Sequence, residues 1–290
     1  MGYATVAEVK STINFPSTGA PVIDSDINSF ISYAEEEIEN IYHTKFGNIE
    51  KTGTATSGTT TTITVSGTPY TIDEYIDYVV WIIAGTNSGE YRKITTNTVS
   101  VLTVSSAFSA AIDDTSQFRI TKLGYKSETV DGTGEKVQFV QYQPLIKLNS
   151  LTIDSTSVTP SSVYQYETGR LVMSTSAEVC YFSNNTPQLI DLEYIYGVYP
   201  MPRIIKRLCI LLASIRTLTA QISGTYDDFT SVNLPGGFTG SKGEPYMNIR
   251  EAVTGFQGEA KGIIYGTKSE GAVTGDLRTS ASYCPFTIFG

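Results

Sequence analysis

The feature that most constrains the fold is a long, one-sided apolar pattern near residue 200. Apolar side chains recur in steps of four and three over residues 204–222, a spacing that places them along one side of a helix. Pro200 and Pro202 precede the pattern, where proline is tolerated before and within a first helical turn, and a glycine follows it. The pattern predicts a helix over residues 202–223, the strongest in the chain, with an apolar side that must be buried.

Residues 4–47 predict two further helices. Thr5 and Glu8 have the spacing of a capping box, and a second helix opens at Asp24 or Ser25 and ends before Gly47. The apolar stripe of the second helix comprises Ile27, Phe30, Ile31, Ala34, Ile38 and Ile41. The acidic residues that lie largely off this stripe are Glu35, Glu36, Glu37 and Glu39. A shorter helix is predicted over residues 246–264, weakened by three glycines.

The middle of the chain predicts strands. Residues 49–122 are rich in Thr, Ser and β-branched residues, and their apolar positions alternate between short turn sequences. The strands expected in this segment are 60–65, 78–83, 90–95, 99–104 and 117–121. Those expected after it are 136–142, 148–153, 171–173, 179–182 and 189–196. Several short strands at regular spacing indicate a compact barrel or sandwich.

These patterns predict an α+β protein. We expect a small core of three to four helices with an antiparallel β region and an inserted all-β barrel or sandwich. The predicted segments are 1–48 (helices), 49–122 (inserted β-module), 123–265 (strands plus the long helix) and 266–290 (a C-terminal arm).

Composition narrows the classes of function. With 20 basic and 29 acidic residues, the formal net charge is −9. This charge argues against binding of nucleic-acid phosphates by overall electrostatic attraction. Cys180, Cys209 and Cys284 are far apart and form no CxxC pair, which favours a reducing compartment. No signal-peptide pattern opens the chain, and the apolar run at 204–215 is too short to span a bilayer. We expect a soluble protein made in a cytoplasm, without a membrane partner.

No catalytic, cofactor or metal pattern is evident. His43 is the only histidine, which excludes multi-histidine metal sites, and its place near a helix end favours a surface or capping role. The glycine-rich stretch 234–245 fails the phosphate-loop pattern, because Gly243 stands where Ser or Thr would bind the metal ion. Clustered carboxylates at 24/26, 73/74/77, 113/114 and 227/228 lack the EF-hand pattern and are interpreted as turn and helix-start residues. We expect no enzymatic activity.

Two groups of residues are candidates for contacts with partners. Arg203, Lys206 and Arg207 give the long helix a basic edge, which is either simply solvated or faces an acidic partner or passing DNA. The stretch 266–290 is rich in Gly, Ser and Thr but ends in an apolar cluster, unlike a plain disordered tail. Its candidate inter-subunit residues are Tyr283, Phe286, Ile288 and Phe289. This end either folds back on its own subunit or docks on a neighbour as a peptide arm.

The order of elements resembles the head-tail connector (adaptor, neck) proteins of tailed phages. The stretches that carry the resemblance are 5–10, 24–43, 144–153, 164–172 and 191–197, followed by Pro200, Pro202 and the long helix. Residues 85–94 and 115–120 resemble a β-module that recurs in phage virion proteins. Typical connectors are shorter and lack so large a β insertion, and the stretch from Gly266 has no counterpart in the family pattern.

The resemblance implies a fold and a role. In that family the last strand ends at a glycine, and a proline introduces a helix that packs on the first two. It implies a homo-oligomeric ring, commonly of twelve subunits, that is assembled in the host cytoplasm and sits in the virion neck. The implied partners are other copies of the chain, the portal protein and the next neck or tail protein, with packaged DNA passing nearby. The alternatives are another tail-completion or decoration protein, or a glycan-binding adhesin-like module.

Overall fold

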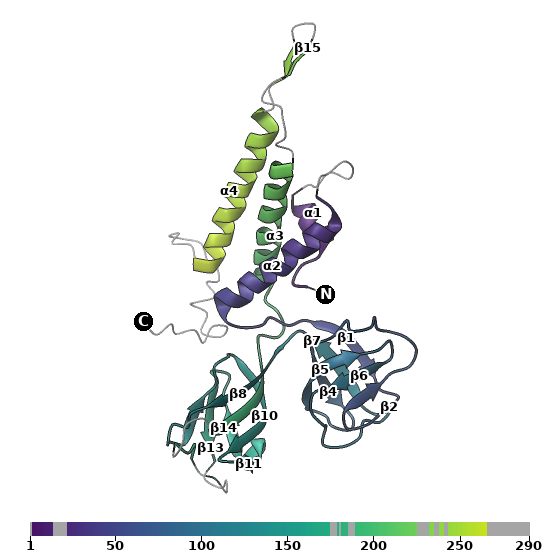
Figure 1. Ribbon diagram of the computed structural model, residues 1–290, viewed down its shortest axis with the longest axis vertical. Coiled ribbons are helices and arrows are strands. Elements are labelled where there is room, and N and C mark those ends of the chain that lie inside the picture. Colours follow the sequence, from purple (N-terminus) through teal and green to yellow (C-terminus); the bar gives the residue numbers. More distant parts are fainter. Residues whose placement is uncertain are drawn as a thin grey trace. The chain divides into compact units, whose positions relative to one another are not determined.

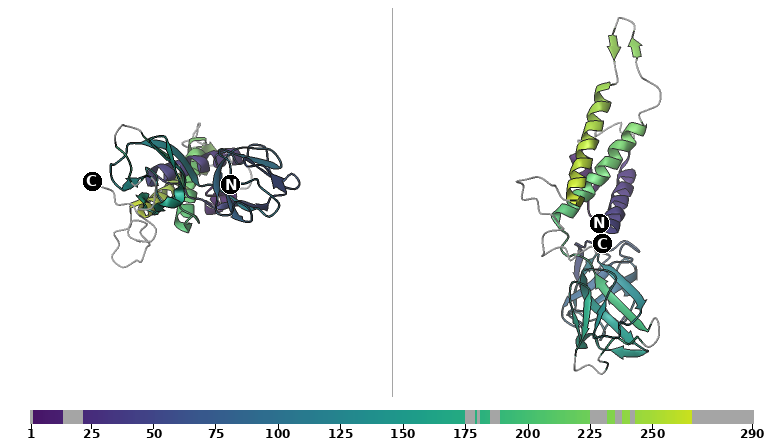
Figure 2. Two further views of the ribbon diagram at one scale, coloured as in Figure 1. Left: turned by 90° about the horizontal axis from the view of Figure 1, so that it is seen from below. Right: turned by 90° about the vertical axis from the view of Figure 1, so that its left-hand side faces the viewer.

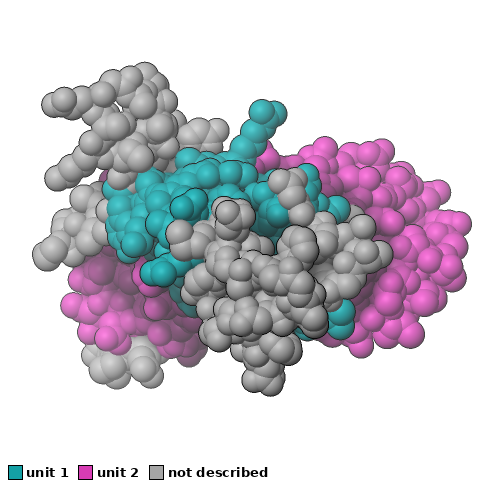
Figure 3. All heavy atoms as spheres, turned by 90° about the horizontal axis from the view of Figure 1, so that it is seen from above, with its two compact units in different colours: residues 1–42, 202–290 teal, residues 43–201 magenta. Residues whose placement is uncertain are grey.

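The computed structural model describes residues 2–13, 22–174, 179, 181–184, 189–224, 232–234, 238–240 and 243–265. The chain divides into two compact units, coloured separately in Figure 3. The helical unit comprises Met1–Tyr42 with Pro202–Gly290, and the β unit comprises His43–Met201. Four helices and several antiparallel sheets lie in the described residues, so the predicted α+β class is confirmed.

The helical unit is built from both ends of the chain (Figure 1). Its helices are α1 (Val6–Thr12), α2 (Asp24–Tyr42), α3 (Arg203–Gly224) and α4 (Gly243–Tyr265). The predicted capping box at the start of α1 is present: the Thr5 hydroxyl accepts from the Glu8 N–H, and the Glu8 carboxylate accepts from the Thr5 N–H at 3.0 Å. A short hairpin of β15 (Val232–Leu234) and β16 (Phe238–Gly240) lies between α3 and α4 along the chain.

Helix α3 is the centre of the helical unit, because α1, α2 and α4 all pack on it. Figures 1 and 2 show α3 and α4 side by side and antiparallel. Burial on α3 extends beyond the apolar stripe to Cys209, Ser214 and Thr217, since partners cover the helix from several sides. On α2, Glu35 is buried, although its sequence position is off the stripe, because its carboxylate accepts a hydrogen bond from the Tyr3 N–H.

Helix α4 is longer than the predicted 246–264. A Cβ added at Gly255 or Gly258 would meet no atom within 4 Å, so these glycines face open space. Ala260, by contrast, is buried. The glycines lower the intrinsic helix propensity, but packing against α3 outweighs that loss.

The first half of the β unit is a seven-stranded antiparallel sheet around one core, in the order β1-β7-β4-β5-β6-β3-β2. Its strands are β1 (Ile49–Thr54), β2 (Ser57–Gly58), β3 (Thr62–Thr64), β4 (Val79–Ala84), β5 (Tyr91–Asn97), β6 (Val101–Val104) and β7 (Gln117–Thr121). We call this part the barrel. Its β4 explains the continuous apolar run in the sequence: Val80 and Ile82 enter the barrel core, whereas Val79 joins a second cluster on the opposite face.

The second half of the β unit is a two-layer sandwich. One layer has the order β11-β10-β14-β8 and the other the order β12-β13-β9. The strands are β8 (Gly124–Val130), β9 (Val137–Phe139), β10 (Leu145–Ile153), β11 (Thr156–Val158), β12 (Val163–Gln165), β13 (Arg170–Met173) and β14 (Ile190–Tyr196), with a 3-10 turn at Pro160–Ser162. The two layers share one apolar core, to which Leu148, Leu171 and Leu192 belong.

Two expectations from the sequence differ from the structure. The described residues of the predicted strand 179–182 are not in a strand, although Phe182 exchanges backbone hydrogen bonds with Gly134 and Glu135. The predicted segments join residues 123–201 to the helices, whereas in the structure they form one compact unit with the barrel. The predicted boundary at residue 123 follows a shift in amino-acid composition along the chain. Which segments pack together depends on tertiary contacts, and composition does not indicate these.

The segments by which the chain enters and leaves the β unit are hydrogen-bonded to each other. Phe46 and Val198 form a parallel bridge, and the Met201 N–H donates to the Gly47 carbonyl at 2.9 Å. Gly197, at a φ of 131°, directly follows β14, the last strand before α3. A Cβ there would lie 2.8 Å from the Lys45 carbonyl oxygen, so both conformation and space require glycine.

Candidate interaction surfaces

The predicted basic edge lies in the first two turns of α3. Lys206 Nζ is 2.5 Å from Glu8 Oε1 of α1, and Arg207 forms a two-pronged pair with Glu259 of α4, at 2.8 and 2.9 Å. Arg203 is exposed and forms no ion pair with the residues that the structure describes. Two of the three predicted partner-facing cations therefore tie α3 to its neighbouring helices.

These pairs shift the pKa values of their members. The hydrogen bond to Glu259 raises the pKa of Arg207, and the same bond lowers the pKa of Glu259. Partial burial pushes the pKa of Glu8 upward, but hydrogen bonds from Lys206 and Thr5 outweigh it and leave that pKa below its usual value. The groups are substantially exposed, so the pairs orient the helices more than they stabilise them.

A shallow depression of about 420 Å³ lies between α2 and α3. It is lined by Tyr33, Glu36, Glu37, Asn40, Ile41 and Arg216. Arg216 Nη2 is 2.7 Å from Glu37 Oε2, and its guanidinium lies 5.7 Å from the centroid of the Tyr33 ring. We call this surface the α2 depression; it combines two carboxylates and one cation with exposed apolar groups.

The three-stranded layer of the sandwich carries an aromatic surface on its outer side. The strand pairing places outward side chains in two rows that cross the three strands. One row consists of Tyr164 on β12, Val172 on β13 and Val137 on β9. The other consists of Tyr166, Arg170 and Phe139. We call these six residues the outer face. Phe139, Tyr164 and Tyr166 are 56%, 61% and 46% exposed, and the Arg170 guanidinium lies 5.2 Å from the Tyr166 ring centroid.

The side chains that alternate with the outer face point the other way. Val163, Leu171 and Met173 are buried in the sandwich core. The layer is therefore apolar on both sides, whereas an antiparallel sheet with one free side is usually polar there. The expectations from the sequence did not include this surface. The signal in the sequence is the pair of tyrosines at 164 and 166, two residues apart, where outward polar residues would be expected.

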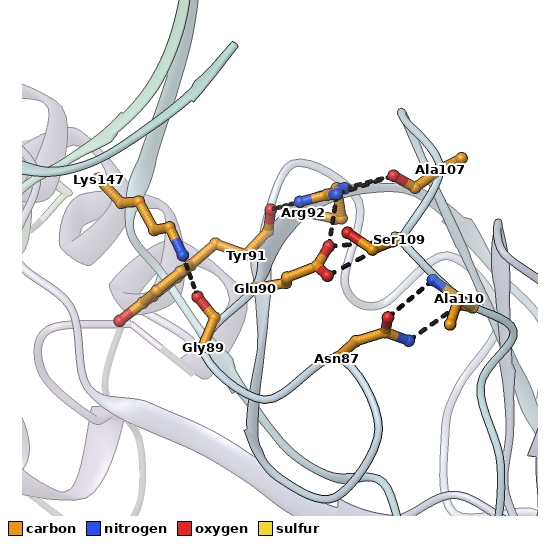
Figure 4. A network of polar contacts seen from close by, with 9 residues as sticks. All are labelled: Asn87, Gly89, Glu90, Tyr91, Arg92, Ala107, Ser109, Ala110 and Lys147. Carbon is orange, nitrogen blue, oxygen red and sulfur yellow. Dashed lines mark hydrogen bonds and ion pairs between the residues drawn. The ribbon is translucent and has the colours of Figure 1, made fainter. Parts of the chain in front are cut away.

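The barrel and the sandwich meet at the turn between β4 and β5, which Figure 4 shows. In that turn the Asn87 amide both donates to and accepts from the backbone of Ala110, at 2.9 Å each. Glu90 pairs with Arg92 at 2.6 Å, and Arg92 donates to the Ala107 carbonyl. These contacts fix the turn against the loop before β7.

Lys147 of β10 fastens the sandwich to that turn. Its ammonium group donates to the Gly89 carbonyl oxygen and lies 5.8 Å from the centroid of the Tyr91 ring, which stacks on Trp81. Burial lowers the pKa of Lys147. Beside it, an apolar cluster joins Val79 of the barrel to Ile195 of the sandwich.

The remaining candidates from the sequence lie in turns, loops and helix ends where they are described. His43 is exposed and directly follows α2 at a φ of 50°, a helix-terminating conformation. Asp113 accepts hydrogen bonds from Thr115, Thr86 and Ser116 in an exposed loop, which lower its pKa to about 2. Asp73 and Asp77 occupy positive-φ turn positions.

Some candidates lie outside the described residues. These are Tyr283, Phe286, Ile288 and Phe289 of the arm, the aspartates at 227 and 228, and residues 235–237, 241 and 242 of the stretch 234–245. Among the residues that are described, no group of three or more His, Cys, Asp or Glu side chains is placed to hold a metal ion. Nor does that part of the chain contain a helix with the length and apolarity needed to cross a membrane.

No protein-family model matches the chain, and no curated protein matches it in sequence. One solved structure that matches is a chain from the "Neck of empty GTA particle computed with C6 symmetry". The match covers 87% of each chain at 11% sequence identity, with a TM-score of 0.35.

Proposed function

We propose that this protein is a non-enzymatic structural component of a phage-type virion, a head-tail connector that forms a ring in the neck. The observation that carries the proposal is the construction of the helical unit. Helices from the two ends of the chain pack together, and α3 begins just after a strand, a glycine and two prolines, then packs on α1 and α2. This is the arrangement that the family resemblance implies.

The helical unit supplies surfaces suited to a ring. A closed ring is built from heterologous contacts, in which one surface of a copy meets a different surface of the next. The α2 depression offers carboxylates with exposed Tyr33 and Ile41, while the exposed cation Arg203 lies in the first turn of α3. Opposite charges at different places favour such a heterologous contact.

The proposed partners follow from the same role. The ring binds the portal and the next neck or tail protein, and the arm from Gly266 onward contacts a neighbouring molecule. DNA passes through the lumen, and the net charge of −9 disfavours its adhesion there. The protein is assembled in the host cytoplasm and located in the neck of the virion.

Electron microscopy tests this proposal directly. The full-length protein is imaged alone and after mixing with portal-bearing heads, and its mass is measured under native conditions. We expect closed rings of constant subunit number, twelve in line with the family pattern, or added density at the portal vertex. Persistent monomers that leave portal-bearing heads unchanged would overturn it, and density elsewhere on the particle would indicate a decoration or tail-completion protein.

A pair of matched variants tests the basic edge. The variant R203Q/K206Q/R207Q removes all three cations, whereas E8Q/E259Q breaks the same two internal ion pairs but keeps the cations. If the cations contact a partner, only the triple variant loses attachment to heads, and both variants remain folded. Equal losses in the two variants would show that the basic residues act through their internal pairs.

A further inference from the structure

The outer face lies on the side of its three strands that points away from the core of the sandwich. The buried side of the same three strands fills the core, so Phe139, Tyr164 and Tyr166 add apolar surface without adding internal packing. An exposed cluster of large aromatic side chains on one sheet face is typical of an interaction site.

The arm has the complementary composition. It comprises the 25 residues 266–290, and its last twelve residues contain no Asp, Glu, Lys or Arg. Phe286 and Ile288 are two residues apart, so an extended chain places both on one side, about 7 Å apart. Tyr164 and Tyr166 are also two residues apart on an outward-facing strand, so the spacings match.

We propose that residues 283–289 of one copy pack as an extended segment on the outer face of a neighbouring copy. This proposal rests on the proposed ring, which brings copies together, and it names the receptor of the arm. An extended arm of 25 residues reaches about 80 Å, enough to leave its own subunit. The contact buries aromatic surface on both partners.

Charge decides between the outer face and the α2 depression as the receptor. The uncharged end of the arm, docked on the α2 depression, would take Glu36 and the Glu37–Arg216 pair out of water without offering the Glu36 carboxylate a partner, which is costly. The outer face has a single charged group, Arg170, and its guanidinium already lies over the Tyr166 ring. The arm can therefore cover the outer face without burying an unpaired carboxylate.

Disulfide trapping in the full-length protein tests the proposal. In a C180S background, Y164C places a thiol on the outer face, and the natural Cys284 supplies the thiol in the arm. The matched control is I72C on the barrel, because Ile72 is 66% exposed and Tyr164 is 61% exposed. After mild oxidation, we expect chain-to-chain products on a non-reducing denaturing gel with Y164C and not with I72C.

Proteolysis gives a second readout that needs no oxidation. Trypsin can cut after Arg278, just before the apolar end of the arm. Docking should slow this cut roughly tenfold in the assembled wild type, a ratio that corresponds to about 1.4 kcal/mol. The variant F139S/Y166S should lose the protection, and the control I72S/I76S, which changes exposed barrel residues, should keep it.

The outcomes separate this proposal from the proposed function. Rings without trapping or protection would overturn the docking and leave the connector role standing. Links confined within single chains would show that the arm folds back on its own subunit, which also overturns it. Failure to form rings or intermolecular links would refute both. Sugar binding that F139S/Y166S abolishes, with an unprotected arm, would assign the face to glycans instead.

Discussion

The two outer sides of the sandwich differ in how their apolar groups are covered. On the four-stranded layer, Ile195 is fully buried in a cluster with Val79 and Leu123, and Lys147 reaches the barrel turn. On the three-stranded layer, Phe139 and Tyr164 remain exposed. The first side is covered by the chain's own barrel, whereas the described chain leaves the second uncovered.

This difference separates residues that hold the protein together from residues available to a partner. We call the cluster of Val79, Leu123 and Ile195, against which Tyr91 and Tyr125 pack, the junction. Apolar groups at the junction should contribute strongly to folding stability, because unfolding returns them to water. Groups on the outer face should contribute little to stability and much to assembly. Trp81, the only tryptophan, stacks on Tyr91 at the junction, so its fluorescence reports on unfolding there.

The largest effect is expected from truncating the junction. Ile195→Ala should lower the free energy of unfolding of the β unit by about 2–5 kcal/mol, because it leaves a cavity in a fully buried cluster. Tyr164→Ser on the outer face should change it by less than about 0.5 kcal/mol. Denaturant unfolding followed by Trp81 fluorescence measures both, and equal losses would contradict the division.

A pH-dependent effect is expected next. Burial raises the pKa of Tyr91 to about 12, with a further contribution from Tyr199, and burial together with Glu193 raises the pKa of Tyr125 to about 12. A raised folded-state pKa gives stability that is complete below about pH 10 and is lost as the pH rises through about 12. We expect up to about 1 kcal/mol from each tyrosine by pH 11, after allowance for partial exposure.

Unfolding measured at pH 9 and pH 11 checks this prediction. The variant Y91F/Y125F should lose less stability over that interval than the wild type, whatever its stability at neutral pH. An identical loss in the two proteins would show that the junction tyrosines are not the source.

The junction lysine should have a smaller effect. Lys147→Met keeps the apolar stem but removes the ammonium group that bonds to Gly89, so we expect a loss of about 1 kcal/mol. Lys93→Met is the control, because it breaks an exposed pair with Asp77 and should cost less than about 0.5 kcal/mol. A result in the reverse order would argue against Lys147 as a fastening.

The smallest effect is expected on the outer face itself. Arg170→Gln removes the exposed stacking of a guanidinium on Tyr166 and should lower stability by about 0.5 kcal/mol or less. A loss of several kcal/mol in the same unfolding assay would mean that the outer face supports the fold, and the comparison between the two sides would fail.

Much of the fold could be predicted from local patterns. The capping box at Thr5 and Glu8, the start of α2 and strand β7 at Gln117–Thr121 are all where the sequence places them. These features depend on residues close together along the chain. The predicted strand at 179–182 was wrong in its described residues, because Phe182 meets segments distant in sequence.

The candidate surfaces were harder to predict. The basic edge was visible as a run of cations, but only the structure shows that Lys206 and Arg207 face carboxylates from α1 and α4. The outer face needs the registers of three strands to place Phe139 and Tyr166 on either side of Arg170, although the two residues are 27 positions apart. No short stretch of the sequence contains both residues.

The sequence by itself determined the α+β fold class, the types of secondary-structure element and most of their positions. It could do so because helix and strand periodicity depend on residues close together along the chain. The tertiary structure decided which elements share a core and which apolar groups stay exposed. Residues 123–201 belong with the barrel, and one side of the sandwich remains open. The grouping of residues and the exposure of that side both depend on contacts between segments that are far apart in the sequence. Such contacts contribute free energy only in the folded chain, so no local pattern reports them.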